Sequence, residues 1–233
     1  MGVLLSAGCS NTVGVDLEEE IGYVYKRPFI PYSNTDSEKV RIYRRQNNLS
    51  TKLANKLQHR CVNIGVPGNS NENIIMGAID YIENHHDVDF ALINLTSASR
   101  FSYMVNKNLH HFNLVFNSEQ LKESTGIKHK SFSHFIEFLR KYCLNNWNMK
   151  YKLQHQIRYI ISYLTLKRIP YFISSTINND VELSTLTDYA TNVYMDDFCH
   201  EKGFKRLEGG HYGSDAHEAW ANYLYENIKN YTT

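Results

Sequence analysis

The sequence predicts an α/β protein built around a parallel sheet. Short apolar runs alternate with segments of helical spacing, and strands separated by helices pair in parallel through right-handed crossovers. The run Phe90–Leu95 is almost entirely apolar, as expected of a central strand covered on both faces. At 233 residues the chain is long enough for one sizeable domain, and no repeat, low-complexity tract or linker divides it. We therefore expect a single domain over residues 1–233.

The first half of the chain begins with a short apolar strand and continues with helical patterns. Apolar residues recur at helical spacing between Val40 and Leu57, and the basic end of that segment suits a helix C-terminus. Within it, Arg44 and Arg45 are expected on a solvated face. The predicted elements are a strand over Gly2–Ala7, a loop over Val13–Asp36, a helix over Ser37–Arg60, a strand over Cys61–Val66 and a helix over Asn71–Asn84.

The second half has a weak pattern at first and a clear one later. Residues 101–166 are expected to carry a helical insertion or lid, with a short edge strand over Phe112–Phe116. The helical stretch Ser131–Lys167 is unusually long and predicts two helices or one kinked helix. The remaining predicted elements are strands over Phe90–Leu95 and Pro170–Ser174 and helices over Asp188–His200 and Ser214–Lys229.

Composition and charge limit the classes of partner. The formal charge of +1 gives no general electrostatic reason to expect nucleic acid or a membrane surface as a partner. No apolar run approaches the roughly 18 residues of a membrane span, and no signal peptide is apparent, so we expect a cytoplasmic protein. The four cysteines lack metal-like spacing, which favours reduced thiols. We expect neither a metal nor another cofactor.

Two short segments carry candidate catalytic chemistry. The first strand runs into Gly8-Cys9-Ser10, which puts a hydroxyl at the carboxyl end of a buried strand, where open α/β sheets bind ligands. Far downstream, Glu208-Gly209-Gly210-His211 puts a carboxylate three residues before a histidine. A nucleophile, a base and an acid that orients the base form an acyl-transfer triad. Alternatively, Ser10 only caps the following turn. His217, close to Asp215, is a competing base that we interpret as structural.

These segments resemble the sequence blocks of the SGNH (GDSL-like) hydrolases. Gly8-Cys9-Ser10-Asn11-Thr12, Asn63-Ile64-Gly65-Val66-Pro67-Gly68-Asn69-Ser70 and Glu208-Gly209-Gly210-His211 appear in the order of that family's first, second and last blocks. The resemblance implies a flavodoxin-like three-layer α/β/α sandwich and hydrolysis of an ester, often an acyl or acetyl group on a carbohydrate or lipid. It assigns the triad to Ser10, His211 and Glu208. It also assigns two oxyanion donors, the amides of Ser10 and Gly68.

The departures from the family pattern concern the first, third and last blocks. In the first block, Cys9 stands where the family usually has Asp. In the last block, Glu208 replaces the Asp that usually orients the histidine, and Tyr212 replaces a proline. The third block reads Thr96-Ser97-Ala98-Ser99-Arg100 and lacks the usual Gly-x-Asn-Asp. Thr96 or Ser97 is then the candidate third oxyanion donor, and Arg100 a candidate for binding an anionic substrate group. This layout resembles family members of bacteriophages and marine microbes, which suggests a phage-encoded protein.

Two kinds of function remain open on the sequence. The first is a serine esterase that acts on a small-molecule or glycan ester. The second is a catalytically weak or inactive SGNH-fold module that binds a glycan or serves a structural role, and the altered third block favours it. A flavin- or nucleotide-binding protein is disfavoured, because Gly8 and Gly14 alone do not make a phosphate-binding loop. The sequence predicts neither the acyl group nor the oligomeric state.

Overall fold

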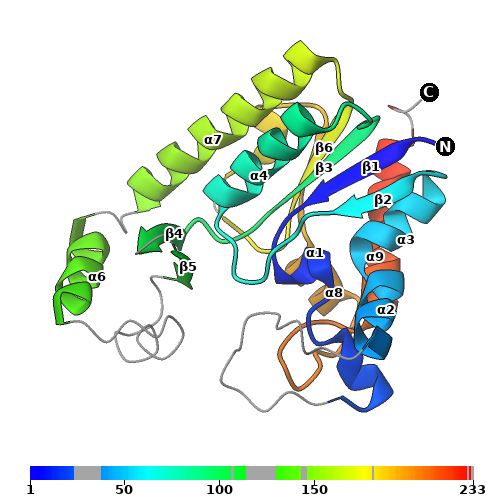
Figure 1. Ribbon diagram of the computed structural model, residues 1–233, viewed down its shortest axis with the longest axis horizontal. Coiled ribbons are helices and arrows are strands. Elements are labelled where there is room, and N and C mark those ends of the chain that lie inside the picture. Colours follow the sequence, from blue (N-terminus) through cyan, green and yellow to red (C-terminus); the bar gives the residue numbers. More distant parts are fainter. Residues whose placement is uncertain are drawn as a thin grey trace.

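The centre of the molecule is a five-stranded parallel sheet (Figure 1). The computed structural model describes residues 1–23, 38–105, 108–113, 130–142, 146–179, 181–229 and 231. The strand order is β2-β1-β3-β6-β7, the order of flavodoxin-like sheets. The strands are β1 (Val3–Ala7), β2 (Arg60–Asn63), β3 (Phe90–Leu95), β6 (Tyr171–Ser175) and β7 (Ala190–Tyr194).

Helices cover both faces of the sheet and make three layers (Figure 1). Because successive side chains of a strand point to opposite faces, β1 places Leu5 and Ala7 in one core and Leu4 in the other. The first core is covered by α4 (Asn71–Asn84) and α7 (Asn146–Lys167). The second is covered by α3 (Leu49–Lys56), α8 (Met195–Glu201) and α9 (Ser214–Ile228). The predicted three-layer α/β/α fold is confirmed.

The single helix expected over Ser37–Arg60 is two helices followed by a strand. The first, α2 (Glu38–Asn47), ends before Asn48, and α3 begins at Leu49. The buried Asn48 caps α3, because its side-chain oxygen accepts a hydrogen bond from the Thr51 amide at 2.9 Å. The helical spacing of apolar residues continues across this break, so periodicity alone does not reveal it.

Arg44 is buried, in contrast to the solvated position expected for it. Its guanidinium forms a two-bond ion pair with Glu18, which lies in the 3-10 helix η1 (Leu17–Ile21) inside the expected loop. The Nε–Oε2 distance is 2.6 Å, and both side chains are almost fully enclosed. Arg45 is exposed, as expected. Whether a given face of a helix is buried or exposed is decided by the segments that pack against it.

The expected helix over Asp188–His200 is wrong in its first half. Residues Ala190–Tyr194 form β7, which pairs with β6 in parallel with an irregular register between Ile173 and Ser175. The helix is confined to α8, which starts at Met195. The β-branched Thr191 and Val193 favour a strand. However, β7 is a partly exposed edge strand, so it lacks the continuous apolar residues by which a central strand is found in a sequence.

Residues 101–166 contain both a peripheral part and a part of the core. β4 (Arg100–Val105) and β5 (Asn108–Asn113) form an antiparallel pair that lies with α6 (Lys130–Tyr142) beyond the end of the layered body (Figure 1). The expected edge strand Phe112–Phe116 overlaps β5 only at its start, and residues 114–116 lie outside the described ranges. By contrast, α7 buries Leu153, Ile157, Ile160 and Leu164 against α4 and the sheet. None of the helices in the described ranges is long and apolar enough to cross a membrane.

Candidate active site

The candidate nucleophile lies on a tight turn at the carboxyl end of β1. The strand ends at Ala7, and the short helix α1 (Ser10–Val13) starts at Ser10. Gly8 allows this turn, because a Cβ there would overlap the Thr12 hydroxyl. Ser10 is only 4% exposed, and its Oγ is held by a partner from the other end of the chain. The turn therefore fixes the hydroxyl at the edge of the sheet where ligands bind.

That partner is His211, as the sequence predicts. Its Nε2 lies 2.8 Å from Ser10 Oγ, a hydrogen-bond distance. His211 sits in the loop before α9, where the Leu207 amide donates to the His211 carbonyl at 2.7 Å and the Gly210 amide donates to the Leu207 carbonyl at 2.9 Å. These bonds close a compact loop around Glu208.

The carboxylate at the other imidazole nitrogen is Asp16, and not Glu208. Asp16 Oδ2 lies 2.7 Å from His211 Nδ1, and the Asp16 side chain is 10% exposed. Glu208 is exposed and makes no hydrogen bond or ion pair among the described residues. Asp16 has a left-handed backbone (φ 70°), a conformation that Asp and Asn adopt more readily than other non-glycine residues. The three side chains form one hydrogen-bonded line from Ser10 through His211 to Asp16.

Gly209 explains how a residue from the start of the chain reaches this histidine. A Cβ at Gly209 would overlap the carboxylate of Asp16, so the missing side chain makes room for the acid. The Gly209 amide also donates to Glu19 Oε1 at 2.8 Å. The glycines between Glu208 and His211 are thus one signal in the sequence that another group approaches the loop. Spacing alone does not identify that group as Asp16.

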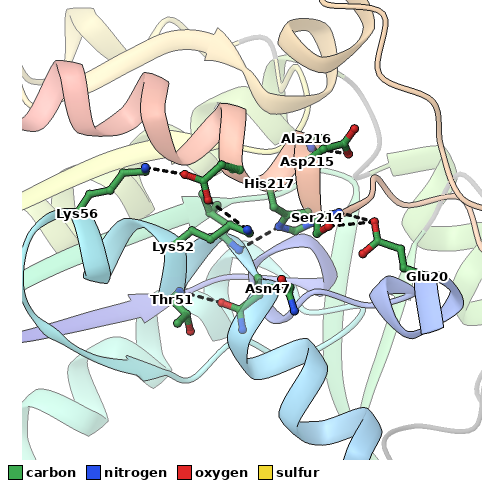
Figure 2. A network of polar contacts seen from close by, with 12 residues as sticks. Glu20, Asn47, Thr51, Lys52, Lys56, Ser214, Asp215, Ala216 and His217 are labelled. Carbon is green, nitrogen blue, oxygen red and sulfur yellow. Dashed lines mark hydrogen bonds and ion pairs between the residues drawn. The ribbon is translucent and has the colours of Figure 1, made fainter.

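Successive acidic residues fasten η1 to the segment that carries the histidine. Glu19 binds the Gly209 amide, and the next residue, Glu20, accepts from the Ser214 amide at 2.8 Å and from the Ser214 hydroxyl at 3.1 Å (Figure 2). Ser214 starts α9, where a carboxylate interacts favourably with the helix dipole. Behind them, Glu18 pairs with the buried Arg44. This acidic segment therefore sets the position of Asp16 relative to His211.

The third sequence block is held mainly by Asn71, the first residue of α4. Asn71 Oδ1 accepts from the Thr96 amide at 2.8 Å, and its Nδ2 donates to the Thr96 carbonyl at 2.9 Å. Ser97 Oγ lies 2.6 Å from Ser99 Oγ. The Thr96 hydroxyl makes no hydrogen bond to any residue of the described ranges. Of the two hydroxyls suggested as oxyanion donors, that of Ser97 is already engaged and that of Thr96 is not.

Gly68 and Arg100 are the remaining residues that the sequence suggests for this site. Gly68 has φ 75° in the Pro67-Gly68 turn, so this turn requires glycine. Arg100 starts β4 and lines a small crevice with residues of α4 and α7. No hydrogen bond or ion pair within the described part of the chain joins either residue to Ser10 or His211.

A buried polar network supports α1 from below. The Asn94 side chain on β3 donates to Thr12 Oγ1 at 2.8 Å and accepts from Ser174 Oγ on β6 at 3.0 Å. Asn63 Nδ2, at the end of β2, donates to the Thr12 carbonyl at 2.7 Å. These contacts tie the nucleophile turn to three strands besides its own. Sequence patterns do not predict these contacts, although the single Asn within the otherwise apolar run Phe90–Leu95 is a visible signal of a buried polar group.

His217, the competing base, has a structural position. It is fully buried on α9, and its Nδ1 accepts the Leu49 amide at 3.0 Å, at the start of α3 (Figure 2). Burial, with a smaller effect of the charges on His211 and Lys52, lowers its pKa to about 3. It makes no hydrogen bond to Ser10. On the same pair of helices, Lys52 binds Glu218 at 3.1 Å.

Comparisons with solved structures place the fold among esterases. A psychrotrophic esterase, EstA, from Pseudoalteromonas sp. is similar with a TM-score of 0.51 at 11% identity, over 99% of this chain and 98% of its own. A carbohydrate esterase family 2 enzyme with a carbohydrate-binding domain, from Corynascus thermopiles (Myceliophthora fergusii), has a TM-score of 0.50 at 12% identity, over 98% of this chain and 67% of its own. No protein-family model and no curated protein matches the chain by sequence. The chain therefore has the fold of the SGNH/GDSL esterases.

Proposed function

We propose that this protein is a serine hydrolase that cleaves an ester by way of an acyl-enzyme. The observation that carries the proposal is the line of hydrogen bonds from Ser10 Oγ to His211 to Asp16, at the carboxyl edge of a parallel sheet. The shared fold supports the reaction class, since the similar structures are described as esterases. Asp16 takes the acidic role that the sequence blocks assign to Glu208.

In the first half of the reaction, Ser10 Oγ attacks the acyl carbon and its proton passes to His211 Nε2. His211 then gives this proton to the departing alcohol, and the acyl group remains on Ser10. In the second half, water attacks the acyl carbon while His211 accepts its proton. The bond between the acyl carbon and Ser10 Oγ then breaks, His211 returns the proton to Ser10 Oγ, and the acyl group leaves as the carboxylic acid. Asp16 holds the imidazole by its Nδ1 proton and stabilises the positive charge that forms in both halves.

The oxyanion donors in this proposal are the amides of Ser10 and Gly68 and the hydroxyl of Thr96. Thr96 is chosen over Ser97 because the Ser97 hydroxyl is bonded to Ser99. A hydroxyl on a rotatable side chain is less preorganised than an amide, so turnover is expected to be slow. Arg100 is retained as a proposed contact for an anionic part of the substrate. A carbohydrate bearing an acetyl or other acyl group is the substrate class proposed.

The test uses a fluorophosphonate probe and a short-chain aryl ester. Wild-type protein should be labelled at Ser10, as identified by peptide mass, and should hydrolyse the ester. Ser10→Ala should lose both, while Ser184→Ala, a change at an exposed serine of η2 (Leu183–Thr185), should lose neither. Thr96→Val should lower kcat by about a hundredfold with little change in KM, since an oxyanion donor acts mainly in the transition state.

A second candidate function is a binding module without catalysis. The observation that favours it is the third block, where Asn71 takes the Thr96 amide and only one free hydroxyl remains. An unlabelled Ser10 in folded protein, together with no ester hydrolysis, would select this function over the first. Labelling that depends on Ser10 would exclude it.

A further inference from the structure

A basic cavity lies along the outer edge of the sheet, and its lining includes none of Ser10, Asp16 and His211. Its volume is about 440 Å³, within the range of roughly 300–1,000 Å³ typical of small-molecule sites. It is bounded by α2, α3, the edge strand β2 and one residue of α4. Its lining includes Arg41, Arg44, Arg45, Arg60, Cys61 and Asn63.

The arginines of this cavity come mostly from one stripe of α2 and its C-terminal neighbour. Arg41, Arg44 and Arg45 follow helical i, i+3, i+4 spacing on α2 and so share one face, and Asn48, which follows the helix, also lines the cavity. On an amphipathic helix the face turned toward the body is ordinarily apolar. The stripe that lines this cavity is instead basic, with Arg44 buried and Arg41 and Arg45 exposed. Arg60, the first residue of β2, adds a fourth guanidinium from the opposite wall.

The positive charges in the cavity exceed the negative charges beside them. No acidic residue belongs to the described lining. Arg44 is paired with Glu18, and Arg60 binds Asp87 at 2.7 Å. Arg41 and Arg45 are exposed, and within the described ranges neither forms an ion pair. Two guanidinium groups thus remain for a ligand.

Cys61, which lies in the lining of the cavity, is subject to the charges of two of its arginines. Burial raises the pKa of Cys61, and a hydrogen bond with Thr51 and the charges of Arg45 and Arg60 act in the opposite direction. Both cations therefore act at one point in the lining of the cavity, the Cys61 thiol. An anion held at that point would interact with both.

The edge strand supplies main-chain donors to the same cavity. Among the residues that the structure describes, β2 pairs with β1 on one side and with no strand on the other. The amides of Arg60 and Ile64 donate to the Gly2 and Ser6 carbonyls of the β1 segment, at 2.7 and 2.9 Å. Because N–H groups alternate in direction along a strand, those of Cys61 and Asn63 point to the outer side. Guanidinium groups and backbone amides are the donors that bind phosphate and sulfate oxygens.

We propose that this cavity binds a tetrahedral oxyanion group, phosphate or sulfate, carried by a small polar molecule, with Arg41 and Arg45 as its main ligands. Guanidinium forks suit this geometry, because each can give two parallel hydrogen bonds to such a group. The cavity extends to Val13, the last residue of α1, and to Gly65 of the second block. The bound molecule would lie beside the turn that carries Ser10. The proposal does not depend on ester hydrolysis.

The test measures binding of inorganic phosphate, inorganic sulfate and a hexose 6-phosphate by calorimetry, at an ionic strength held constant with sodium chloride. Wild-type protein and Ser10→Ala should bind alike. The double variant Arg41→Gln/Arg45→Gln should bind at least about tenfold more weakly, since it loses two charged donors. The matched control Lys150→Gln/Arg158→Gln removes the same charge from exposed positions of α7 and should bind as the wild type does. Tighter binding of the hexose ester than of phosphate would identify an organic ligand, and equal binding the free ion.

A second measurement locates the ligand and does not depend on how the variants fold. Alkylation of Cys61 in wild-type protein, followed on its own peptide by mass spectrometry, should slow when phosphate is added and not when chloride is added. Equal binding by the double variant and the wild type, or an unchanged Cys61 rate at saturating phosphate, would overturn the proposal. Absence of binding to wild-type protein would overturn it as well.

Discussion

Asp16→Asn is the change that most directly tests the proposed triad of Ser10, His211 and Asp16. The substitution removes the negative charge but keeps a side chain of the same shape, and Asn accepts the left-handed backbone at this position (φ 70°). The carboxylate lies 2.7 Å from His211 Nδ1, and the two side chains are 10% and 18% exposed, so water screens the pair only in part. The imidazolium that forms in the transition state would lose its counter-charge.

The size of the effect follows from this geometry. Opposite unit charges about 4 Å apart interact by about 4 kcal/mol at an effective dielectric constant of about 20. A tenfold change in rate corresponds to about 1.36 kcal/mol, so Asp16→Asn should lower kcat by about a thousandfold. The assay is hydrolysis of a short-chain aryl ester, with thermal unfolding followed in parallel. The melting temperature should change little.

Glu208→Gln is the matched control, because it neutralises the carboxylate expected from the sequence blocks. Glu208 is exposed and touches neither His211 nor Ser10, so this variant should keep wild-type turnover. A loss of less than tenfold in folded Asp16→Asn would refute the assignment of Asp16. A thousandfold loss in Glu208→Gln would return the acidic role to Glu208.

Three further changes probe the groups around the line. Gly209→Ala should lower kcat by about a hundredfold in the same assay, because its Cβ displaces the carboxylate of Asp16 and small misplacements near a reacting group have effects of this size. His217→Gln should flatten the dependence of stability on pH: burial lowers the pKa of His217 from 6.5 to about 3, so between these values the unfolded chain binds a proton that the folded chain does not. The contribution of neutral His217 to the free energy of unfolding is therefore complete above pH 6.5 and is lost as the pH falls toward 3. The slope is up to about 1.4 kcal/mol per pH unit, and urea unfolding at several pH values would measure it. Arg44→Met should lower the free energy of unfolding by about 3–5 kcal/mol, because it leaves the buried Glu18 charge without its partner, and Glu18→Gln added to it should restore much of the loss.

Each of these has a control or a contrary outcome. Gly77→Ala, in α4, adds a Cβ whose nearest neighbour is the Ile64 Cδ1 at 3.9 Å, and should leave turnover unchanged. Wild-type turnover in Gly209→Ala would show that Asp16 does not need the space beside that glycine. Parallel stability curves for the wild type and His217→Gln would mean that His217 does not titrate on unfolding. If Arg44→Met is as stable as wild type, the ion pair contributes nothing.

The sequence by itself determined the elements that depend on local pattern. The helix over Asn71–Asn84 and the strand over Phe90–Leu95 have the same bounds in the structure. The apolar face of the helix and the mostly apolar run of the strand are each patterns within one short segment of sequence. It also predicted the contact between Ser10 and His211. A hydroxyl directly after a buried strand and a histidine in a glycine-containing loop are typical of that chemistry wherever they meet.

Only the tertiary structure decided which carboxylate serves the histidine. Asp16 and His211 are 195 residues apart, and they meet because η1 packs against the loop before α9 through Glu19 and Glu20. Packing likewise buried Arg44 while its neighbour Arg45 stayed exposed, and paired residues 190–194 with the sheet. Local sequence determines the conformations a segment favours. The partner that a side chain finds depends on which distant segment packs against it, and no periodicity within the segment carries that information.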